Sequence, residues 1–584
     1  MSYLNPSLPI EERVDDLLSQ MTLEEKAGQL FHTANVMHPD GDLLETPDEA
    51  NGVRTAAELV ARRNITHFNL LNGDNPHAIA EWHNRLQDLA ASTRLGIPVT
   101  VSTDPRHGLF SSPATGMVTD ALSRWPEHTG LAATGSAELV REYGDAVRRE
   151  LGAMGIRVFL GPMADLYTDP RWSRGYGTFG EDPELAARLT GAFIEGLRGD
   201  DPHTEVAAMV KHFPGGGPQK DGNDAHDPRY PEQVYPGSQQ NLHLLPFESA
   251  FAAGVTQIMT YYGMPVGTSW EEVGFAFNKP VVTGLLREHY GFDGIVCADW
   301  NVIEGTMLAG EPFGPNGWGL AHLTPLQRMA RALDAGVDQF GGDDNPALVV
   351  ELVRSGQISE QRVDASVRRL LREKFRLGLF ERRHVDVEEA VRVVGADPLR
   401  SVGRTAQRQS LVLLQNSGVL PLPSDAKVYT EGLAYGSAVP LHEADVAILR
   451  LHAPYEKDGR ALSEWFHGGD LRWPGDQIDH VRRIAATLPT VVLVYLERPA
   501  ILTPLAEVAA AVVGDFGSDD DVLLDLVFGR YGSSGRLPFD LPSSMKAVEE
   551  SREDVPFDTA DPLFRFGSGL VLETGASATG FRDS

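Results

Sequence analysis

The chain has 584 residues, of which 42% are hydrophobic and 23% are charged, and its formal net charge is −31. This length exceeds what one hydrophobic core supports, so two or more domains are expected in an otherwise ordinary soluble globular composition. The charge excludes nucleic acid as a partner, because a phosphate backbone requires a basic surface, and we interpret the acidity as a contribution to solubility.

The single cysteine, Cys297, excludes an intrachain disulfide. It lies in an apolar segment, where a small core residue is expected rather than a nucleophile. The first six residues show no basic region followed by an apolar stretch, so we expect no signal peptide and a cytoplasmic location. No apolar run reaches the length of a membrane span, so a membrane partner is not expected.

Predicted helices and strands alternate over the first two thirds of the chain. Residues 10–32 are expected to be helical, with Thr22 and Glu25 as a capping box. Later helices are predicted at residues 137–154 and 183–197. Apolar runs predict strands between the helices, at residues 67–71, 98–102, 157–160, 206–210, 257–260, 295–298 and 337–340. This alternation is typical of a parallel α/β fold.

Polar side chains recur where these predicted strands end, at Asp104, Asp165, Lys211, His212, Tyr261, Tyr262 and Asp299. An open, doubly wound sheet gathers such groups at one switch point. Their recurrence at nearly every strand instead favours a closed (β/α)8-type barrel, whose site lies at the carboxyl ends of its strands. The sequence therefore predicts one shared pocket at the barrel mouth.

A second α/β pattern begins after a predicted helix at residues 364–377. The charged stretch 381–400 is interpreted as an irregular linker. Beyond it, a helix is predicted at residues 477–488, and strands are predicted at residues 428–430, 446–451, 490–495 and 511–513. No GxGxxG motif follows a strand, so a dinucleotide site is not expected.

A series of motifs, taken in order and at these separations, resembles family 3 glycoside hydrolases. They are MTLEEKAGQL (21–30), DPRWSR (169–174), FGEDP (179–183), KHFPG (211–215) and ADW (298–300). The resemblance covers residues 10–380 well and the second region more loosely. It implies an α/β protein with a TIM-like (β/α)8 barrel (1–385), a linker (386–400), an α/β sandwich domain that contributes the acid/base loop (401–575) and a tail (576–584).

The resemblance implies an exo-acting, retaining enzyme that removes terminal β-linked glucose or xylose without a cofactor or a metal. Retention requires two carboxyls about 5–5.5 Å apart, one to attack the anomeric carbon and one to protonate the leaving oxygen. Asp299 matches the family's nucleophile, and the alternative is an Asp that caps the next helix. Trp300 is expected to stack on a sugar or to wall the pocket, with core packing as the alternative.

Further residues match sugar-binding positions of the family. Lys211 and His212 are expected to hold hydroxyls of the innermost sugar, and Asp104 to accept two hydroxyls of a vicinal diol. The alternatives are a core histidine at 212 and an Asx-turn at 104. Arg174 matches the pocket arginine, but the glutamate that often follows it is absent from residues 175–178, which puts the sugar preference in doubt. Tyr261 matches an aromatic residue whose phenol would donate to the nucleophile.

The acid/base residue is the least determined part of the predicted site. In two-domain members it is a second-domain glutamate at a variable position, for which Glu456 is the first candidate and Glu464 the second. Either has the alternative of a solvated loop charge. The cluster 465–467 (WFH) indicates that this loop packs onto another surface, such as the barrel mouth. Asp224 and His226 compete, because they resemble the proton-donating Asp–His pair of single-domain N-acetylglucosaminidases; otherwise they would bind substrate.

Other functions stay open beside the predicted β-glucosidase or β-xylosidase. They are a β-N-acetylhexosaminidase that uses the Asp–His pair, a catalytically inert sugar-binding homologue, and a metal-dependent barrel hydrolase. Neither an HExxH motif nor a tight His-x-His cluster supports the last. The expected partner is a small oligosaccharide or an aryl β-glycoside, with no nucleic acid and no membrane, and a homodimer is left open.

Overall fold

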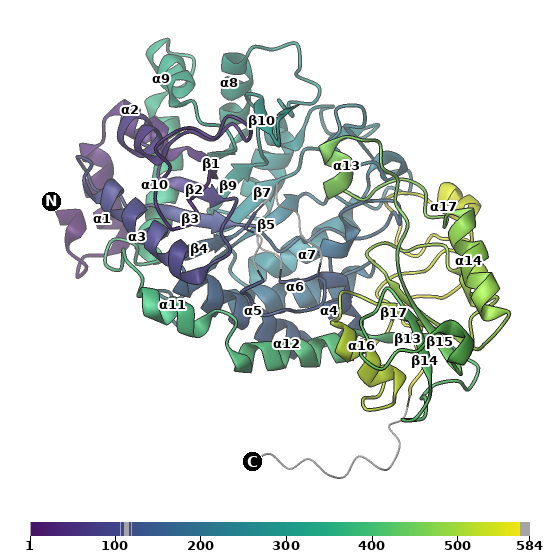
Figure 1. Ribbon diagram of the computed structural model, residues 1–584. Coiled ribbons are helices and arrows are strands. Elements are labelled where there is room, and N and C mark those ends of the chain that lie inside the picture. Colours follow the sequence, from purple (N-terminus) through teal and green to yellow (C-terminus); the bar gives the residue numbers. More distant parts are fainter. Residues whose placement is uncertain (1, 105–106, 110–115, 118–119, 573–584) are drawn as a thin grey trace.

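The computed structural model describes residues 2–104, 107–109, 116–117 and 120–572 (Figure 1). Its amino-terminal part is a closed barrel of parallel strands in the order β1-β12-β9-β7-β5-β4-β3-β2, which confirms the predicted barrel. The strands are β1 (Phe31–Asn35), β2 (His67–Leu70), β3 (Thr100–Thr103), β4 (Ile156–Phe159), β5 (Ala207–Phe213), β7 (Gln257–Thr260), β9 (Ile295–Ala298) and β12 (Gln339–Gly341).

The first barrel strand lies where the sequence predicted a continuous helix. Residues 10–32 divide into α1 (Ile10–Gln20), α2 (Leu23–Gln29) and the start of β1. The predicted capping box is present at the start of α2, where the Thr22 side chain accepts from the Glu25 backbone N–H. Leu30 and Phe31 are both fully buried, so the apolar pattern continues from helix to strand without a visible break.

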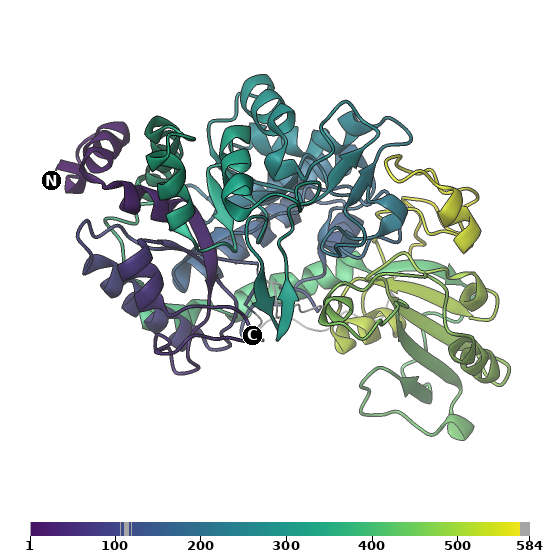
Figure 2. The ribbon, with the colours of Figure 1, turned by 90° about the horizontal axis from the view of Figure 1, so that it is seen from above.

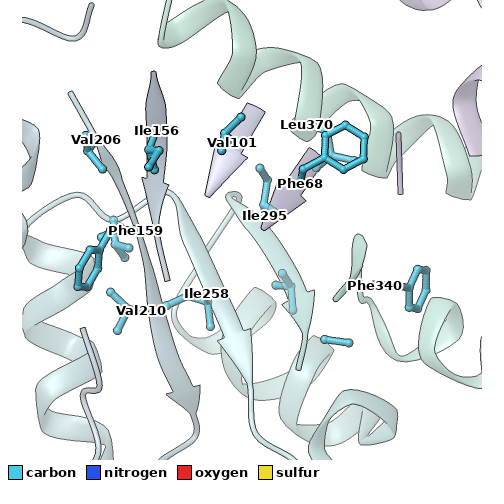
Figure 3. Packing of buried hydrophobic residues seen from close by; sticks show 14 of the residues in the cluster. Phe68, Val101, Ile156, Phe159, Val206, Val210, Ile258, Ile295, Phe340 and Leu370 are labelled. Atoms are coloured by element: carbon cyan, nitrogen blue, oxygen red, sulfur yellow. The ribbon is translucent and has the colours of Figure 1, made fainter. Parts of the chain in front are cut away.

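Helices surround the barrel strands and share one apolar core with them (Figure 3). Each strand is buried on both faces, which explains its nearly continuous apolar sequence. Figure 3 labels Val101 of β3, Ile156 of β4 and Leu370 of α10 (Glu360–Arg376), which all belong to this core. The helices are α3 (Pro76–Ala91), α4 (His128–Thr134), α5 (Ala137–Ala153), α6 (Pro183–Arg198), α7 (Gln240–Ala252), the segment Pro280–His289, α8 (Pro325–Ala335), α9 (Pro346–Arg354) and α10 (Glu360–Arg376).

The stretch expected to be an irregular linker is helical instead. It contains α11 (Val387–Val393) and the start of α12 (Asp397–Ser410). Asp386 caps α11 by accepting the backbone N–H groups of Glu388 and Glu389, and Ala390 is fully buried against the barrel core. The charged residues of this stretch therefore lie on the solvent side of amphipathic helices.

The second domain is built on a five-stranded sheet in the order β13-β17-β16-β15-β14, in which only β13 is antiparallel to its neighbour. Its strands are β13 (Val412–Asn416), β14 (Val428–Glu431), β15 (Val446–His452), β16 (Thr490–Tyr495) and β17 (Ala511–Asp515). Its helices are α13 (Ala461–Trp465), α14 (Gly475–Ala485), α15 (Thr503–Ala506), α16 (Asp520–Val527) and α17 (Met545–Glu550).

Two short strand pairs lie outside these sheets: parallel β6 (Glu232–Val234) with β8 (Met264–Val266), and the antiparallel hairpin of β10 (Thr306–Leu308) and β11 (Glu311–Phe313).

The second domain packs directly beside the barrel (Figure 2). Tyr167 and Trp172 of the barrel belong to the same buried apolar cluster as Phe516 and Phe539 of the second domain. The oxygens of the Glu181 carboxyl group also accept backbone N–H groups from the second domain, at 2.9 Å from Asp540 and 2.6 Å from Phe557. These buried contacts fix the second-domain loops against the barrel. Among the described residues, no helix combines the length and apolar character that crossing a bilayer requires.

Candidate active site

A pocket opens at the carboxyl ends of the barrel strands and is lined by residues of both domains. It brings together most of the predicted site residues, namely Asp104, Arg174, Lys211, His212, His226, Asp299 and Trp300. Asp224 and Tyr261 lie in contact with this set rather than in the lining itself. Glu456 and Glu464 do not line the pocket.

Asp299 follows β9 directly, where the buried strand ends at the pocket. One carboxylate oxygen, Oδ1, accepts the backbone N–H of Trp300 at 2.8 Å. The other, Oδ2, is buried without a hydrogen-bond partner and lies 3.9 Å from Nε2 of His212. A buried carboxylate oxygen without a donor is costly to maintain, and its lone pairs are available to a substrate. Trp300 is partly buried, with its ring 5.6 Å from that of His32.

Lys211 and His212 project from the end of β5 into the pocket. Nζ of Lys211 donates to Oδ2 of Asp104 at 2.7 Å, so Asp104 is held by an ion pair. His212 uses Nδ1 to contact Oδ2 of Asp165 at 2.8 Å, which leaves Nε2 on the side of Asp299. Burial lowers the pKa of His212, and the Arg174 charge lowers it further, so a neutral imidazole is favoured.

The sequence predicted Asp165 at a strand end, either lining the mouth or paired with Arg171 or Arg174, and the structure bonds it to His212 instead. It is fully buried, and its Oδ1 accepts backbone N–H groups of His212 and Gly216. Burial acts to raise its pKa, but His212 and the two backbone donors hold that pKa below its ordinary value. Asp165 therefore stays ionised and orients the His212 ring.

Arg174 supplies unpaired donors to the pocket. Its Nε and Nη1 groups are buried without hydrogen-bond partners, and its guanidinium lies 5.7 Å from the centre of the Phe466 ring. Burial acts to lower its pKa, but Asp224 and the other nearby acidic groups raise it, so the cation persists. The next residue is a glycine because a Cβ at Gly175 would lie 1.9 Å from the Tyr167 ring. A larger residue does not fit there.

Asp224 and His226 form a bonded pair at the pocket wall. Oδ1 of Asp224 contacts Nδ1 of His226 at 2.5 Å, and its Oδ2 accepts from the indole of Trp172 at 2.9 Å. Burial acts to raise the Asp224 pKa, but His226 and Arg174 together hold it far below its ordinary value. An ionised Asp224 fixes a proton on Nδ1 of His226 and leaves Nε2 for the pocket. The His226 ring stacks on Phe466 at 4.6 Å.

The prediction that the Tyr261 phenol donates to Asp299 is wrong, because its hydrogen bond is to another carboxylate. Its phenol donates to Oδ2 of Asp224 across a long 3.5 Å. The next residue, Tyr262, lines the pocket instead, and its phenol donates to the Trp300 carbonyl at 2.8 Å. Successive side chains at a strand end point in different directions, so a shift of one residue exchanges the two tyrosines.

The second-domain loop reaches the pocket through aromatic residues rather than through its glutamates. Trp465 and Phe466 line the pocket, which agrees with the packing predicted for this cluster. Glu456 is exposed and lies against Gly469, where an added Cβ would approach its Oε2 within 2.5 Å. Glu464 is also exposed and pairs with Lys457 at 2.8 Å. Both glutamates therefore have the placement of loop charges.

Several other pocket residues carry no recognisable signal in the sequence. Met307, Leu308 and Phe313 belong to the β10–β11 hairpin, and Asn51 to a loop that packs on it. Their contribution depends on long-range loop packing, which no local pattern encodes. Within the described ranges, no group of three or more His, Cys, Asp or Glu side chains is arranged to hold a metal ion.

Family models match both parts of the chain. Residues 22–373 match the family model described as glycosyl hydrolase family 3 N terminal domain, and residues 437–572 match its C-terminal domain. The chain is 46% identical to beta-glucosidase C of Emericella nidulans, over 98% of this chain and 94% of that protein. It is 41% identical to a periplasmic beta-glucosidase/beta-xylosidase of Dickeya chrysanthemi, over 97% of this chain and 91% of that protein.

A solved structure shares the fold at low sequence identity. The beta-glucosidase from Listeria innocua, in complex with isofagomine, superimposes with a TM-score of 0.74 at 23% identity. That match covers 96% of this chain and 83% of the other.

Proposed function

The chain belongs to glycosyl hydrolase family 3, and from that premise we propose that it releases terminal β-linked glucose, and xylose, from the non-reducing ends of small glycosides. The names of the relatives, beta-glucosidase and beta-glucosidase/beta-xylosidase, support this sugar class. One observation carries the proposal: Asp299 offers an unpartnered carboxylate oxygen inside a pocket with hydroxyl-binding groups.

The pocket residues divide the work of binding one sugar. Asp104 accepts hydroxyls of the sugar ring, while Lys211 and the free N–H groups of Arg174 donate to others. These contacts hold the anomeric carbon at Asp299, so that attack becomes effectively unimolecular. The departure from the family after Arg174 leaves this side without a glutamate, which is consistent with acceptance of more than one sugar.

Reaction then proceeds in two displacements at the anomeric carbon. Asp299 forms a bond to that carbon as the bond to the leaving oxygen breaks and a pocket acid gives that oxygen a proton. The same group, now a base, takes a proton from water, and the water oxygen replaces Asp299. The sugar leaves with its β configuration retained, and Asp299 is restored as a carboxylate.

For the proton donor, His226 has the best placement of the three candidates. Of these three, it alone lines the pocket, and Asp224 holds its Nδ1 proton so that Nε2 is the group that exchanges. Glu456 and Glu464 are exposed outside the lining. This order reverses the expectation from the sequence, which placed Glu456 first.

The experiment compares His226→Ala, Glu456→Ala and Glu464→Ala on two β-glucosides. A 2,4-dinitrophenyl glucoside needs little protonation of its leaving group, whereas cellobiose needs it fully. We expect His226→Ala to lose about 100-fold or more of kcat on cellobiose and to retain turnover of the dinitrophenyl substrate. When azide is added to His226→Ala, it should attack the glycosyl-enzyme without a general base and give a β-glucosyl azide.

The other variants and substrates decide between the alternatives. If Glu456→Ala shows the selective loss and His226→Ala does not, the donor belongs to the second domain. The Asp224–His226 pair also favours a second candidate function, a β-N-acetylhexosaminidase. A higher kcat/KM on 4-nitrophenyl N-acetyl-β-glucosaminide than on the glucoside would support it. Absence of turnover on all these β-glycosides would support the inert homologue.

A further inference from the structure

The β10–β11 hairpin and the second-domain loop both form parts of the pocket wall. Both the hairpin and α13 contribute lining residues, and Figure 1 places them on the same side of the molecule. The His226 ring lies between the two, at 4.6 Å from the Phe466 ring and 6.3 Å from the Phe313 ring. A proton donor must lie beside the leaving oxygen, so these walls enclose the leaving group.

The hairpin side of this enclosure has an apolar surface. Met307, Leu308 and Phe313 line it with side chains that donate no hydrogen bond, and each is partly exposed to the pocket. Trp465 and Phe466 provide aromatic faces from the second-domain loop. An aromatic face suits a sugar ring as well as an apolar ring. The aliphatic side chains of Met307 and Leu308 therefore decide which kind of leaving group is preferred.

The Asn51 amide and the tip of the hairpin are engaged within the protein. Oδ1 of Asn51 accepts the Ala309 backbone N–H at 3.1 Å, and its Nδ2 donates to Asp48 at 2.7 Å. The Gly310 backbone N–H donates to Ala50 at 2.9 Å. The hairpin is therefore braced against the 48–52 loop. Among its residues that line the pocket, Thr306 alone carries a polar side chain.

We propose that the leaving-group side of this pocket is built for an apolar aglycone that carries a flat ring, such as an arylalkyl group, rather than for a second sugar. The proposal rests on the proposed β-glucosidase function. A second sugar would lose water from several hydroxyls and meet one hydroxyl, that of Thr306, among the hairpin side chains of the lining, whereas an apolar ring gains free energy by burial against Met307, Leu308 and Phe313.

The test compares 2-phenylethyl β-glucoside with cellobiose. The phenylethyl alcohol is a poorer leaving group than a sugar hydroxyl, so faster hydrolysis of this substrate must come from aglycone binding. We expect its kcat/KM to exceed that of cellobiose by about tenfold or more. We also expect Met307→Asn to lower the ratio of phenylethyl glucoside to β-glucosyl fluoride turnover by about tenfold. Glu311→Gln, an exposed change on the same hairpin, is the matched control.

β-Glucosyl fluoride separates this inference from the proposed function because its leaving group occupies no aglycone site. If the enzyme hydrolyses the fluoride but prefers cellobiose to phenylethyl glucoside, the aglycone inference is overturned and the proposed function stands. An unchanged ratio in a folded Met307→Asn variant would also overturn it. If the fluoride is not hydrolysed, the proposed function fails, and the inference falls with it.

Discussion

Arg498 is predicted to hold the second-domain loop in place at the pocket. Its side chain is fully buried and donates to backbone carbonyls on both domains. The acceptors are Pro454 at 2.9 Å, Gly468 at 3.1 Å, Gly469 at 2.7 Å and, on the barrel, Arg171 at 3.0 Å. Replacement by Met keeps much of the volume and removes every donor, so the loop that carries Phe466 loses its attachment.

The free-energy cost of Arg498→Met can be worked out from these hydrogen bonds. A hydrogen bond from a charged group contributes about 1.5–3 kcal/mol. Removal of the guanidinium also removes the penalty of its burial, which is several kcal/mol. Part of the gross loss is thereby offset, and we expect a net cost of about 3 kcal/mol to loop ordering. That cost corresponds to an increase of about 100-fold in the open population of the loop.

Limited proteolysis and steady-state kinetics measure this effect in Arg498→Met. Cleavage within residues 454–469 should accelerate by about 100-fold under conditions where opening is at equilibrium. As cleavage accelerates, the kcat/KM for 2-phenylethyl β-glucoside should fall, because Phe466 no longer holds its place in the pocket wall. Arg472→Met is the control, because Arg472 lies in the same loop but is exposed and bonds only to Asp470. Cleavage and kinetics equal to those of the control would refute the reasoning.

Three further predictions concern stability and sugar binding. Burial raises the pKa of Glu181 to about 8 from its ordinary value of 4.5. The unfolded chain thus loses this proton at a lower pH than the folded protein does. As the pH rises from 4.5 to 8, the free energy of unfolding should therefore fall by up to about 1.4 kcal/mol per pH unit. Glu181→Gln should flatten that slope in urea unfolding from pH 5 to 8, and an unchanged slope would contradict it. Gly175→Ala places a Cβ 1.9 Å from the Tyr167 ring, and we expect it to cost about 1–3 kcal/mol in thermal unfolding. Gly284→Ala, where a Cβ meets nothing within 4 Å, is its control, and equal effects would count against the steric argument. Asp104→Asn should lower kcat/KM on an aryl glucoside by about 100-fold or more, because a charged acceptor for hydroxyls is lost; a loss of less than about tenfold would remove Asp104 from sugar binding.

The barrel was predictable because its strands are buried on both faces and end abruptly in polar residues. Asp299 and the Lys211–His212 pair illustrate this, since the carboxyl ends of parallel strands converge on one mouth. β1 and β13 were missed because each follows a helix with no turn residue to mark the change. The expected cytoplasmic location and the open question of a homodimer stay predictions, and one relative is named periplasmic.

The remaining site residues depend on contacts that local patterns do not encode. Tyr261 and Tyr262 differ by one position, and only the conformation at the end of β7 decides that Tyr261 bonds to Asp224 and Tyr262 to the Trp300 carbonyl. Glu456 and His226 were both plausible donors in the sequence, and the loop packing that exposes the first and buries the second arises from the docked domains. Local chemistry proposes candidates, and long-range packing selects among them.

Covalent trapping of the enzyme tests the central claim most directly. A 2-deoxy-2-fluoro-β-glucosyl fluoride forms the glycosyl-enzyme but slows its hydrolysis, so the label can be mapped by peptide mass spectrometry. We predict a single fluoroglucosyl group on Asp299, together with β-glucose as the first product from natural substrate. A label on another residue, or α-glucose as the first product, would contradict the role of Asp299.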